Sequence, residues 1–316
     1  MSITTDDDGP HQPSPGESTD WQESLAFHFF DPRRRIGGFF HTGLQRLIDR
    51  ADIWSWIAVE GRTVHNFQHL DLRLPKEDFP RFRLGPLGCT TTTPLTGRHL
   101  VVADGATQLS LQYDAIFPAT HYGSSHSGSG SGHFAKGHFE TLGRAVGELK
   151  LGNEVLKIDA FAFDDRSWGV RDWRHILTYR LFWAMFGPDL YVIMYTTTSP
   201  EEKRTWGFVF DRGTRSNIVD IEMEVSVATN GVFARRFEAL LWTDTGGAYR
   251  INGQADGNLV VTQRHGFMES PTLCRMEMNG RVGGGVLEFA ELKQPTTEIS
   301  AQFGLMEHPE DAAARR

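Results

Sequence analysis

Apolar and polar residues alternate along much of this chain. From Val219 to Val227 the odd positions are apolar, whereas the even positions carry acidic or hydroxyl side chains. Leu109, Leu111 and Tyr113 alternate with polar residues in the same way. A period of two is typical of a β-strand with one buried face, so both segments are predicted to be strands.

Turn signals separate such segments at short intervals. Asn279-Gly280 and Asp256-Gly257 each stand between two apolar runs, and Asp211-Arg212-Gly213 stands between Trp206–Phe210 and Ile218–Val227. Asn-Gly and Asp-Gly suit two-residue hairpins because both central residues of a type I′ turn need positive φ. We therefore expect hairpins at these three positions.

Helical periodicity is limited to one or two turns, at Leu44–Ile48 and at Trp173–Leu177. Many short strands, with turns every ~8–12 residues, indicate an all-β sandwich or barrel that is mostly antiparallel. Residues 1–19 and 307–316 lack periodic apolar positions. They are predicted to be a disordered tail and a loose tail.

Composition excludes several classes of protein. The formal net charge is −8, so a nucleic-acid-binding surface is not expected. No apolar run approaches the ~18 residues of a transmembrane helix, and the acidic start Asp6–Asp8 is unlike a signal peptide. Cys89 and Cys274 are too few for a Cys-rich zinc site or a disulfide scaffold. We expect a cytoplasmic globular protein with no nucleic-acid partner and no membrane span.

The segment Gly123–Gly132 consists of Gly and Ser with a single His, which is the composition of a flexible linker. It is either a mobile surface loop or a lid over the mouth of a barrel, since loops on rigid scaffolds often gate sites.

The most distinctive segment is Asp164–Trp173, which holds three acids, two arginines and two tryptophans. In an extended strand, alternate residues point to the same side. One face then carries Arg166, Trp168, Val170 and Asp172, and the other carries Asp165, Ser167, Gly169, Arg171 and Trp173.

Within this segment, the run Ser167–Trp173 resembles the signature of the AttH-like/hydroxyneurosporene synthase-like superfamily of double lipocalins, which includes carotenoid 1,2-hydratases and kievitone hydratase. Relatives carry Arg-Asp-His-Ser-Trp-Gly, whereas this chain has Asp164 and Arg166 at the positions of the Arg and the His. Further features that support the resemblance are Trp21-Gln22-Glu23, His138-Phe139-Glu140 and Met278–Gly285.

The resemblance implies two consecutive lipocalin-like antiparallel β-barrels or sandwiches, which we place at residues 20–163 and 164–306. It also implies hydratase, cyclase or pericyclase chemistry on hydrophobic isoprenoid or polyketide-like molecules, without a redox cofactor. The 22 Phe, eight Trp and six Tyr suit an aromatic-lined pocket, although they also suit an ordinary core.

Asp172 is the leading candidate for a general acid. Protonation of an alkene needs a neutral carboxylic acid, and burial beside Trp168 and Trp173 would raise the pKa of Asp172. The aromatic faces could then stabilise a carbocation. The alternative is that Asp172 forms an ion pair with a neighbouring arginine and has a structural role.

Glu140 and Glu269 are the other predicted catalytic carboxyls. His138 and Glu140 would share one face of a strand, as an acid–base pair, as part of a metal site or as an exposed polar face. Glu269 would supply a carboxyl from the second barrel. Arg166 has a planar fork that suits an anionic or carbonyl oxygen. The predicted substrate-binding residues are Arg166, Trp168, Trp173, His138 and Arg171.

Other kinds of site find little support. His65 and His69 stand in no His-Glu-x-x-His motif, and the histidines around the Gly/Ser-rich segment are poorly preorganised, so no metal is expected. Gly128-Ser129-Gly130 lacks the strand-to-helix context of a nucleophilic serine. No glycine pattern typical of nucleotide binding follows a predicted strand.

The sequence thus predicts a cofactor-independent hydratase, isomerase or cyclase that acts on a hydrophobic isoprenoid-type molecule, with a homodimer as one possible assembly. The alternatives are a non-catalytic carrier or sensor of a hydrophobic ligand, and a structural protein with a filled lumen. Chemical change of the bound molecule would distinguish the enzyme from the carrier.

Overall fold

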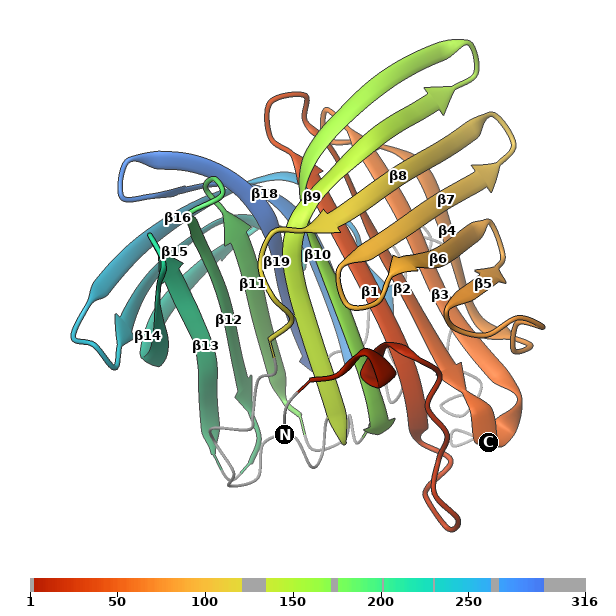
Figure 1. Ribbon diagram of the computed structural model, residues 1–316. Helices are drawn as coiled ribbons and strands as arrows, with labels where there is room; N and C mark the ends of the chain where they lie inside the picture. Colours follow the sequence, from red (N-terminus) through yellow and green to blue (C-terminus); the bar gives the residue numbers. More distant parts are fainter. Residues whose placement is uncertain are drawn as a thin grey trace. The chain divides into compact units, whose positions relative to one another are not determined.

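The computed structural model describes residues 3–120, 135–171, 176–200, 202–229, 231–262 and 267–292 (Figure 1). The chain divides into two units, Met1–Asp172 and Trp173–Arg316, and each has its own antiparallel sheet. The all-β class predicted from the alternating pattern is confirmed. Among the described residues, no helix is long and apolar enough to cross a membrane.

The first unit is built on a ten-stranded sheet, in the order β4-β3-β2-β1-β10-β9-β8-β7-β6-β5. In Figure 1 the red and orange strands β1–β4 therefore lie beside the green β9 and β10, because β1 pairs with β10. The elements of this unit are η1 (Thr5–Asp8), β1 (Trp21–Asp31), β2 (Ile36–Gln45), η2 (Arg46–Ile48), β3 (Arg50–Val59), β4 (Arg62–Leu72), β5 (Arg81–Leu84), β6 (Leu87–Thr93), β7 (Gly97–Asp104), β8 (Thr107–Ala115), β9 (Gly137–Leu151) and β10 (Glu154–Val170).

The apolar core of the first unit lies on one face of this sheet. Alternate residues such as Phe27, Phe40, Ile53 and Ala160 are 0–2% exposed and form one cluster. Tyr113 is also fully buried in that cluster, as the alternation in its segment predicts. The opposite face therefore carries the residues between these positions, and it holds the polar cluster described below.

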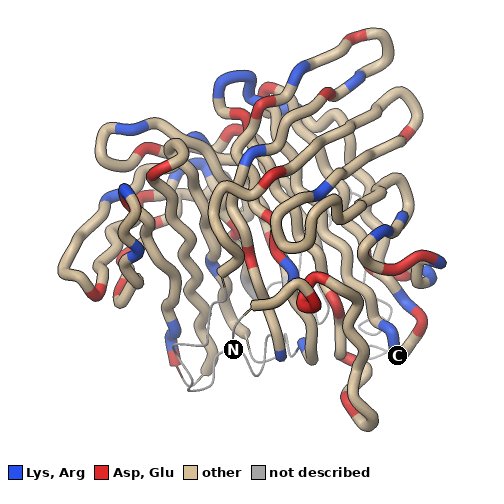
Figure 2. Tube along the Cα trace, viewed as in Figure 1, with Lys and Arg blue, Asp and Glu red and all other residues tan. Residues whose placement is uncertain are grey.

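The start of the chain departs from the sequence-based expectation. Residues 3–20 are described rather than being a disordered tail, and the acidic run of η1, red in Figure 2, lies against the first unit. Asp8 is only 3% exposed because Arg98 of β7 binds its carboxylate. The alternation of apolar residues could not predict this order, since the contacts that hold Asp8 are an ion pair and hydrogen bonds with Arg98.

The boundary between the units also differs from the predicted one. Asp164–Val170 continue β10 and pair with β1, so they belong to the first unit and not to the second. The division therefore falls after Asp172 and not before Asp164. The predicted tail at 307–316 and the predicted lid at Gly123–Gly132 lie outside the described residues.

The second unit closes on itself. Strands β11 to β16 pair in sequence order, β16 pairs with β18, and β19 joins β18 to β11, which completes a ring of eight strands. Its strands are β11 (Thr178–Met185), β12 (Leu190–Thr198), β13 (Lys203–Asp211), β14 (Thr214–Val227), β15 (Ala234–Thr243), β16 (Ala248–Asn258), β17 (Val261–Thr262), β18 (Phe267–Met278) and β19 (Arg281–Leu292). A separate apolar cluster fills this unit, and it includes Phe182, Phe237 and Leu287.

Two of the three predicted hairpins are confirmed. Asn279-Gly280 connects β18 to β19 with φ values of 53° and 72°, and the turn after Asp211 connects β13 to β14. The third prediction was wrong: Asp256-Gly257 lies inside β16, at a register shift in its pairing with β18. A similar shift beside Val219 leaves that side chain 59% exposed and interrupts the predicted alternation of β14.

Candidate functional site

A buried polar cluster occupies the face of the first sheet opposite its apolar core. Glu140 of β9 pairs with Asp165 of β10, Asp165 with Ala26 of β1, and Ala26 with His41 of β2. Residues that lie directly opposite in antiparallel strands point to the same face, so Glu140, Asp165 and His41 share one side of the sheet. Residues two positions away along these strands point to the same face. On one side they are His138, Ser167 and Ser24, and on the other side they are Phe163 and His28.

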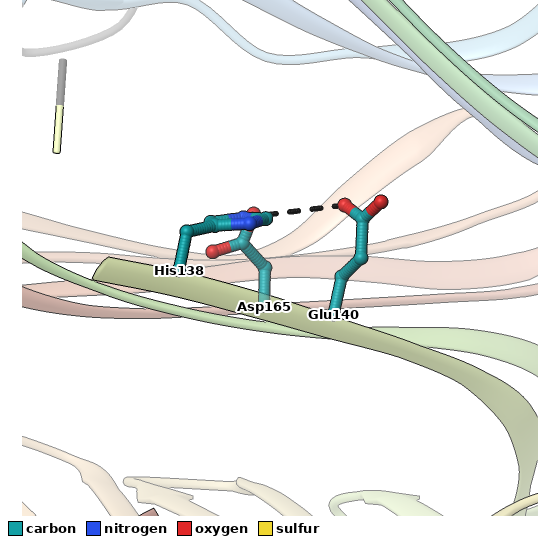
Figure 3. A group of neighbouring side chains, drawn as sticks. All are labelled: His138, Glu140 and Asp165. Carbon is teal, nitrogen blue, oxygen red and sulfur yellow. Dashed lines mark hydrogen bonds and ion pairs between the residues drawn. The ribbon is translucent and has the colours of Figure 1, made fainter. Parts of the chain in front are cut away.

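Three side chains of this cluster converge (Figure 3). His138 Nε2 lies 2.9 Å from Asp165 Oδ2 and 4.0 Å from Glu140 Oε2. The side chains of His138 and Glu140 are 3% and 1% exposed, and that of Asp165 is 14% exposed. His138 and Glu140 are two residues apart on β9, which explains why both point toward the carboxylate of the neighbouring strand.

The electrostatics of Asp165 favour its charged form. Burial alone would raise the pKa of this carboxyl, but the charge of His138 and the hydrogen bond from it, together with Arg171 and His28, hold the pKa below its usual value. Asp165 is therefore the acceptor, and the Nε2–H group of His138 donates to it. In the neutral form of the His138 ring, this leaves Nδ1 as the basic nitrogen.

Two neutral histidines lie on the same face. Burial lowers the pKa of His28 and of His41 to about 3, although the charge of Asp165 acts in the opposite direction on both. The His28 ring stacks on Phe39 and the His41 ring stacks on Trp54, with centroid distances of 4.3 and 4.4 Å. The surroundings of Asp165 on this side are thus aromatic and uncharged at neutral pH.

Two buried polar atoms here have no hydrogen-bond partner among the described residues. They are Nδ1 of His41 and Nε1 of Trp54, from two stacked rings. Buried polar groups are normally paired, so these two atoms are available to a polar group of a ligand.

Arg171 closes the other end of the cluster. Arg171 is 5% exposed, and its guanidinium donates to the hydroxyls of Ser167 and Ser24, while its backbone N–H donates to the carbonyl of Asp20. This cation lowers the pKa of Asp165 and of His41. Arg171 was predicted to bind substrate, and that role stays a prediction.

The arrangement can carry out acid–base chemistry, and its donor atoms also match a metal site. Within the described part of the chain, His138, Glu140 and Asp165 are the one group of three possible metal ligands whose donor atoms all lie within 4.8 Å of one another. No metal was expected from the sequence. His138 Nε2 and Asp165 form a hydrogen bond as the structure stands, so the same three side chains can also act as an acid–base group.

Arg166 does not belong to this cluster. It is fully buried on the opposite face of the same strand, where Glu23 accepts a hydrogen bond of 2.8 Å from it and its guanidinium lies 3.4 Å from the ring centre of Phe79. Trp168 lies on that face too and stacks on His11 at 3.6 Å. The alternation predicted for the segment is correct, and it separates these two residues from His138 and Glu140.

The structure does not test the roles of the three remaining predicted residues. Glu269 is 4% exposed and lies on β18 of the second unit, opposite Val261 and Ala290. Asp172 and Trp173 lie outside the described residues. The roles assigned to these three residues stay predictions.

Sequence reasoning missed three members of the cluster. Asp165 was placed on the correct face of its segment, but it was given no role. His28 and His41 were not singled out, because their place beside Asp165 depends on the pairing of β1 with β10 across more than a hundred residues. A local signal does exist, since His28 interrupts the apolar run Leu25–Phe30 of β1, and His41 directly follows Phe39 and Phe40 in β2.

The fold defines a double lipocalin-like protein, as comparison with solved structures confirms. A protein described as AttH from Nitrosomonas europaea has a TM-score of 0.63 at 11% identity, over 90% of this chain and 97% of its own. Kievitone hydratase from Nectria haematococca has a TM-score of 0.61 at 11% identity, over 86% and 89%. CghA has a TM-score of 0.60 at 11% identity, over 88% and 89%.

The sequence itself places the chain in a family. The profile of the family described as a domain of unknown function, DUF7064, matches residues 4–293, and the chain belongs to that family. No curated protein matches the sequence. The fold expected from the resemblance to the AttH-like superfamily is thus confirmed.

Proposed function

We propose that this protein is a cofactor-independent enzyme that hydrates, isomerises or cyclises a hydrophobic, isoprenoid-type small molecule. The observation that carries the proposal is the buried carboxyl of Glu140 beside the hydrogen-bonded pair of His138 and Asp165. The names of two similar structures support it at the level of chemical class, since one is a hydratase and the other, CghA, was crystallised with the small molecule Sch210972.

Glu140 is the proton donor in this proposal. Glu140 is 1% exposed, and burial favours the neutral form of a carboxyl group, which can deliver a proton to an alkene carbon. A C–H bond forms as the O–H bond of Glu140 breaks, and a carbocation results. The rings of Phe39, Trp54 and Phe163 on the same face can stabilise that cation through their π electrons.

His138 is the base that completes the reaction. In hydration, water adds to the cation and loses a proton to Nδ1 of His138; in isomerisation or cyclisation, a neighbouring carbon loses that proton instead. The Nδ1 proton of His138 then passes through water to the Glu140 carboxylate, which restores both groups, while the Nε2–H group keeps its hydrogen bond to Asp165. Asp165 keeps the ring oriented and stabilises its protonated form, so it is a positioning residue.

The first test is to find the ligand. Native mass spectrometry of the purified protein, with analysis of its organic extract, should detect a hydrophobic molecule with at least one alkene. That molecule and its chemical relatives then form the substrate panel for a product assay. A bound molecule that is recovered unchanged under all conditions would overturn the proposal and favour the carrier.

The second test is a pair of variants on β9. Glu140→Gln removes the proton donor and should lower the rate of product formation by about 100-fold or more. Glu148→Gln is the matched control, because Glu148 is on the same strand and is partly exposed beside Lys157. Asp172→Asn tests the acid predicted from the sequence. Full activity of Glu140→Gln would overturn the assignment of Glu140.

A further inference from the structure

A second polar cluster lies on the core-facing side of the first sheet, where the start of the chain enters. Arg98 Nη1 donates to Asp8 Oδ2 at 2.8 Å, and Arg98 Nη2 donates to Asp8 Oδ1 at 2.6 Å. The backbone N–H of Leu95 donates to Asp8 Oδ2 at 2.7 Å. Three N–H groups thus donate to the Asp8 carboxylate. Two of them come from the guanidinium of Arg98, which binds the carboxylate in a bidentate manner.

The donors belong to the sheet, whereas the carboxylate does not. Arg98 is held by other contacts of the sheet, since its Nη2 lies 3.0 Å from Asp164 and its Nη1 donates to Thr91 at 2.5 Å. Arg166 adds a longer contact of 3.4 Å to Asp8 Oδ1. Asp8 is instead delivered by η1, a single turn of 3-10 helix at the start of the chain.

The segment that carries Asp8 also makes polar contacts on either side of that residue. Its other named contacts are polar or aromatic: Gly9 O accepts from Arg166 at 3.2 Å, and His11 stacks on Trp168 and contacts Glu23 at 3.0 Å. If Asp8 left, Arg98 would keep Asp164 as its partner, but burial raises the pKa of that carboxyl and so weakens it as an anion. A buried guanidinium without a full counter-charge favours the uptake of another anion.

We propose that Arg98, Arg166 and the Leu95 amide form a carboxylate-binding site, which the N-terminal segment fills with its own Asp8. A ligand that carries a carboxylate then competes with this segment for the site. The site is distinct from the His138 cluster, because Arg166 and Asp165 are neighbours on one strand and point to opposite faces. If no carboxylate binds at Arg98, the function proposed for the His138 cluster is not affected.

Chemical rescue tests the proposal in the full-length chain. Asp8→Ala removes the internal carboxylate and leaves room for formate. Formate should raise the midpoint of thermal unfolding of Asp8→Ala by about 2–4 °C beyond its effect on the wild type, whereas chloride at the same ionic strength should not. Asp6→Ala is the matched control, since Asp6 lies in the same turn and is exposed. An equal response of all three proteins to formate would overturn the proposal.

The test remains decisive if Asp8→Ala does not fold by itself. The readout is then the yield of folded protein on refolding in formate or in chloride, and a higher yield in formate supports the site. Equal yields would overturn it. Phosphate serves as a further arm: a rescue by phosphate that exceeds the rescue by formate would contradict the assignment to a carboxylate.

Discussion

His138 and Asp165 are joined by a hydrogen bond of 2.9 Å between neighbouring strands, and Glu140 stands opposite Asp165 on the strand that carries His138. This relationship follows from the β9–β10 register, which sets three ionisable side chains on one buried face. The two strands form one hairpin, so the geometry is fixed by local pairing within the first unit.

Asp165→Asn should lower kcat by about 100-fold or more and change KM little. The reason is that Asp165 orients His138 without contacting the substrate, so its loss affects the reaction more than binding. Steady-state kinetics checks this split. A rise in KM with unchanged kcat would assign Asp165 to substrate binding instead.

The stability of the protein should fall at acid pH because of His28. The pKa of His28 is about 3 in the folded chain, well below the ~6.5 of an unfolded histidine. Between these values the unfolded state binds the additional proton, so the free energy of unfolding falls by about 1.4 kcal/mol per pH unit as the pH decreases from 6.5 toward 3. His28→Gln should remove this part of the slope in urea titrations at several pH values.

The control for that experiment is His99→Gln. His99 lies on β7 and contacts Ser110 near the surface, so its replacement controls for the loss of a histidine outside the buried cluster. Identical slopes for the wild type and His28→Gln would contradict the buried, neutral state of His28.

Removal of metal ions should not affect the enzyme. Dialysis against a strong chelator is expected to leave turnover unchanged, because His138, Glu140 and Asp165 act here through protons. A loss of activity that a divalent cation restores would instead identify the three residues as metal ligands.

Asp8→Ala should lower the free energy of unfolding by about 3–5 kcal/mol, because it leaves the buried guanidinium of Arg98 without its main partner. Asp6→Ala should change it by no more than about 0.5 kcal/mol. Chemical denaturation measures both. A small effect of Asp8→Ala would mean that the start of the chain is not held by this ion pair.

The parts of the fold that depend on local sequence could be predicted. The hairpin at Asn279-Gly280 was, because its two residues suit positive φ by themselves. Asp256-Gly257 has the same local chemistry, yet it continues a strand because β18 pairs with both sides of it. Two residues alone do not show whether the chain turns at that point or continues as a strand paired with a distant one.

In the site, too, some relationships depend on local sequence and others on the pairing of distant strands. His138 and Glu140 share a face at a spacing of two, which the sequence indicates directly. Their contact with Asp165 needs the β9–β10 register, and the approach of His28 and His41 needs β1 to pair with β10. Asp8 and Arg98 are 90 residues apart in the sequence, so no local pattern predicts their ion pair.

The most direct test of the central claim is the turnover of an identified alkene substrate in D2O. Protonation of carbon by Glu140 predicts that each product molecule carries one deuterium bonded to carbon, and that Glu140→Gln forms little of this product. Product formed without a new C–D bond, or formed equally well by Glu140→Gln, would contradict the account.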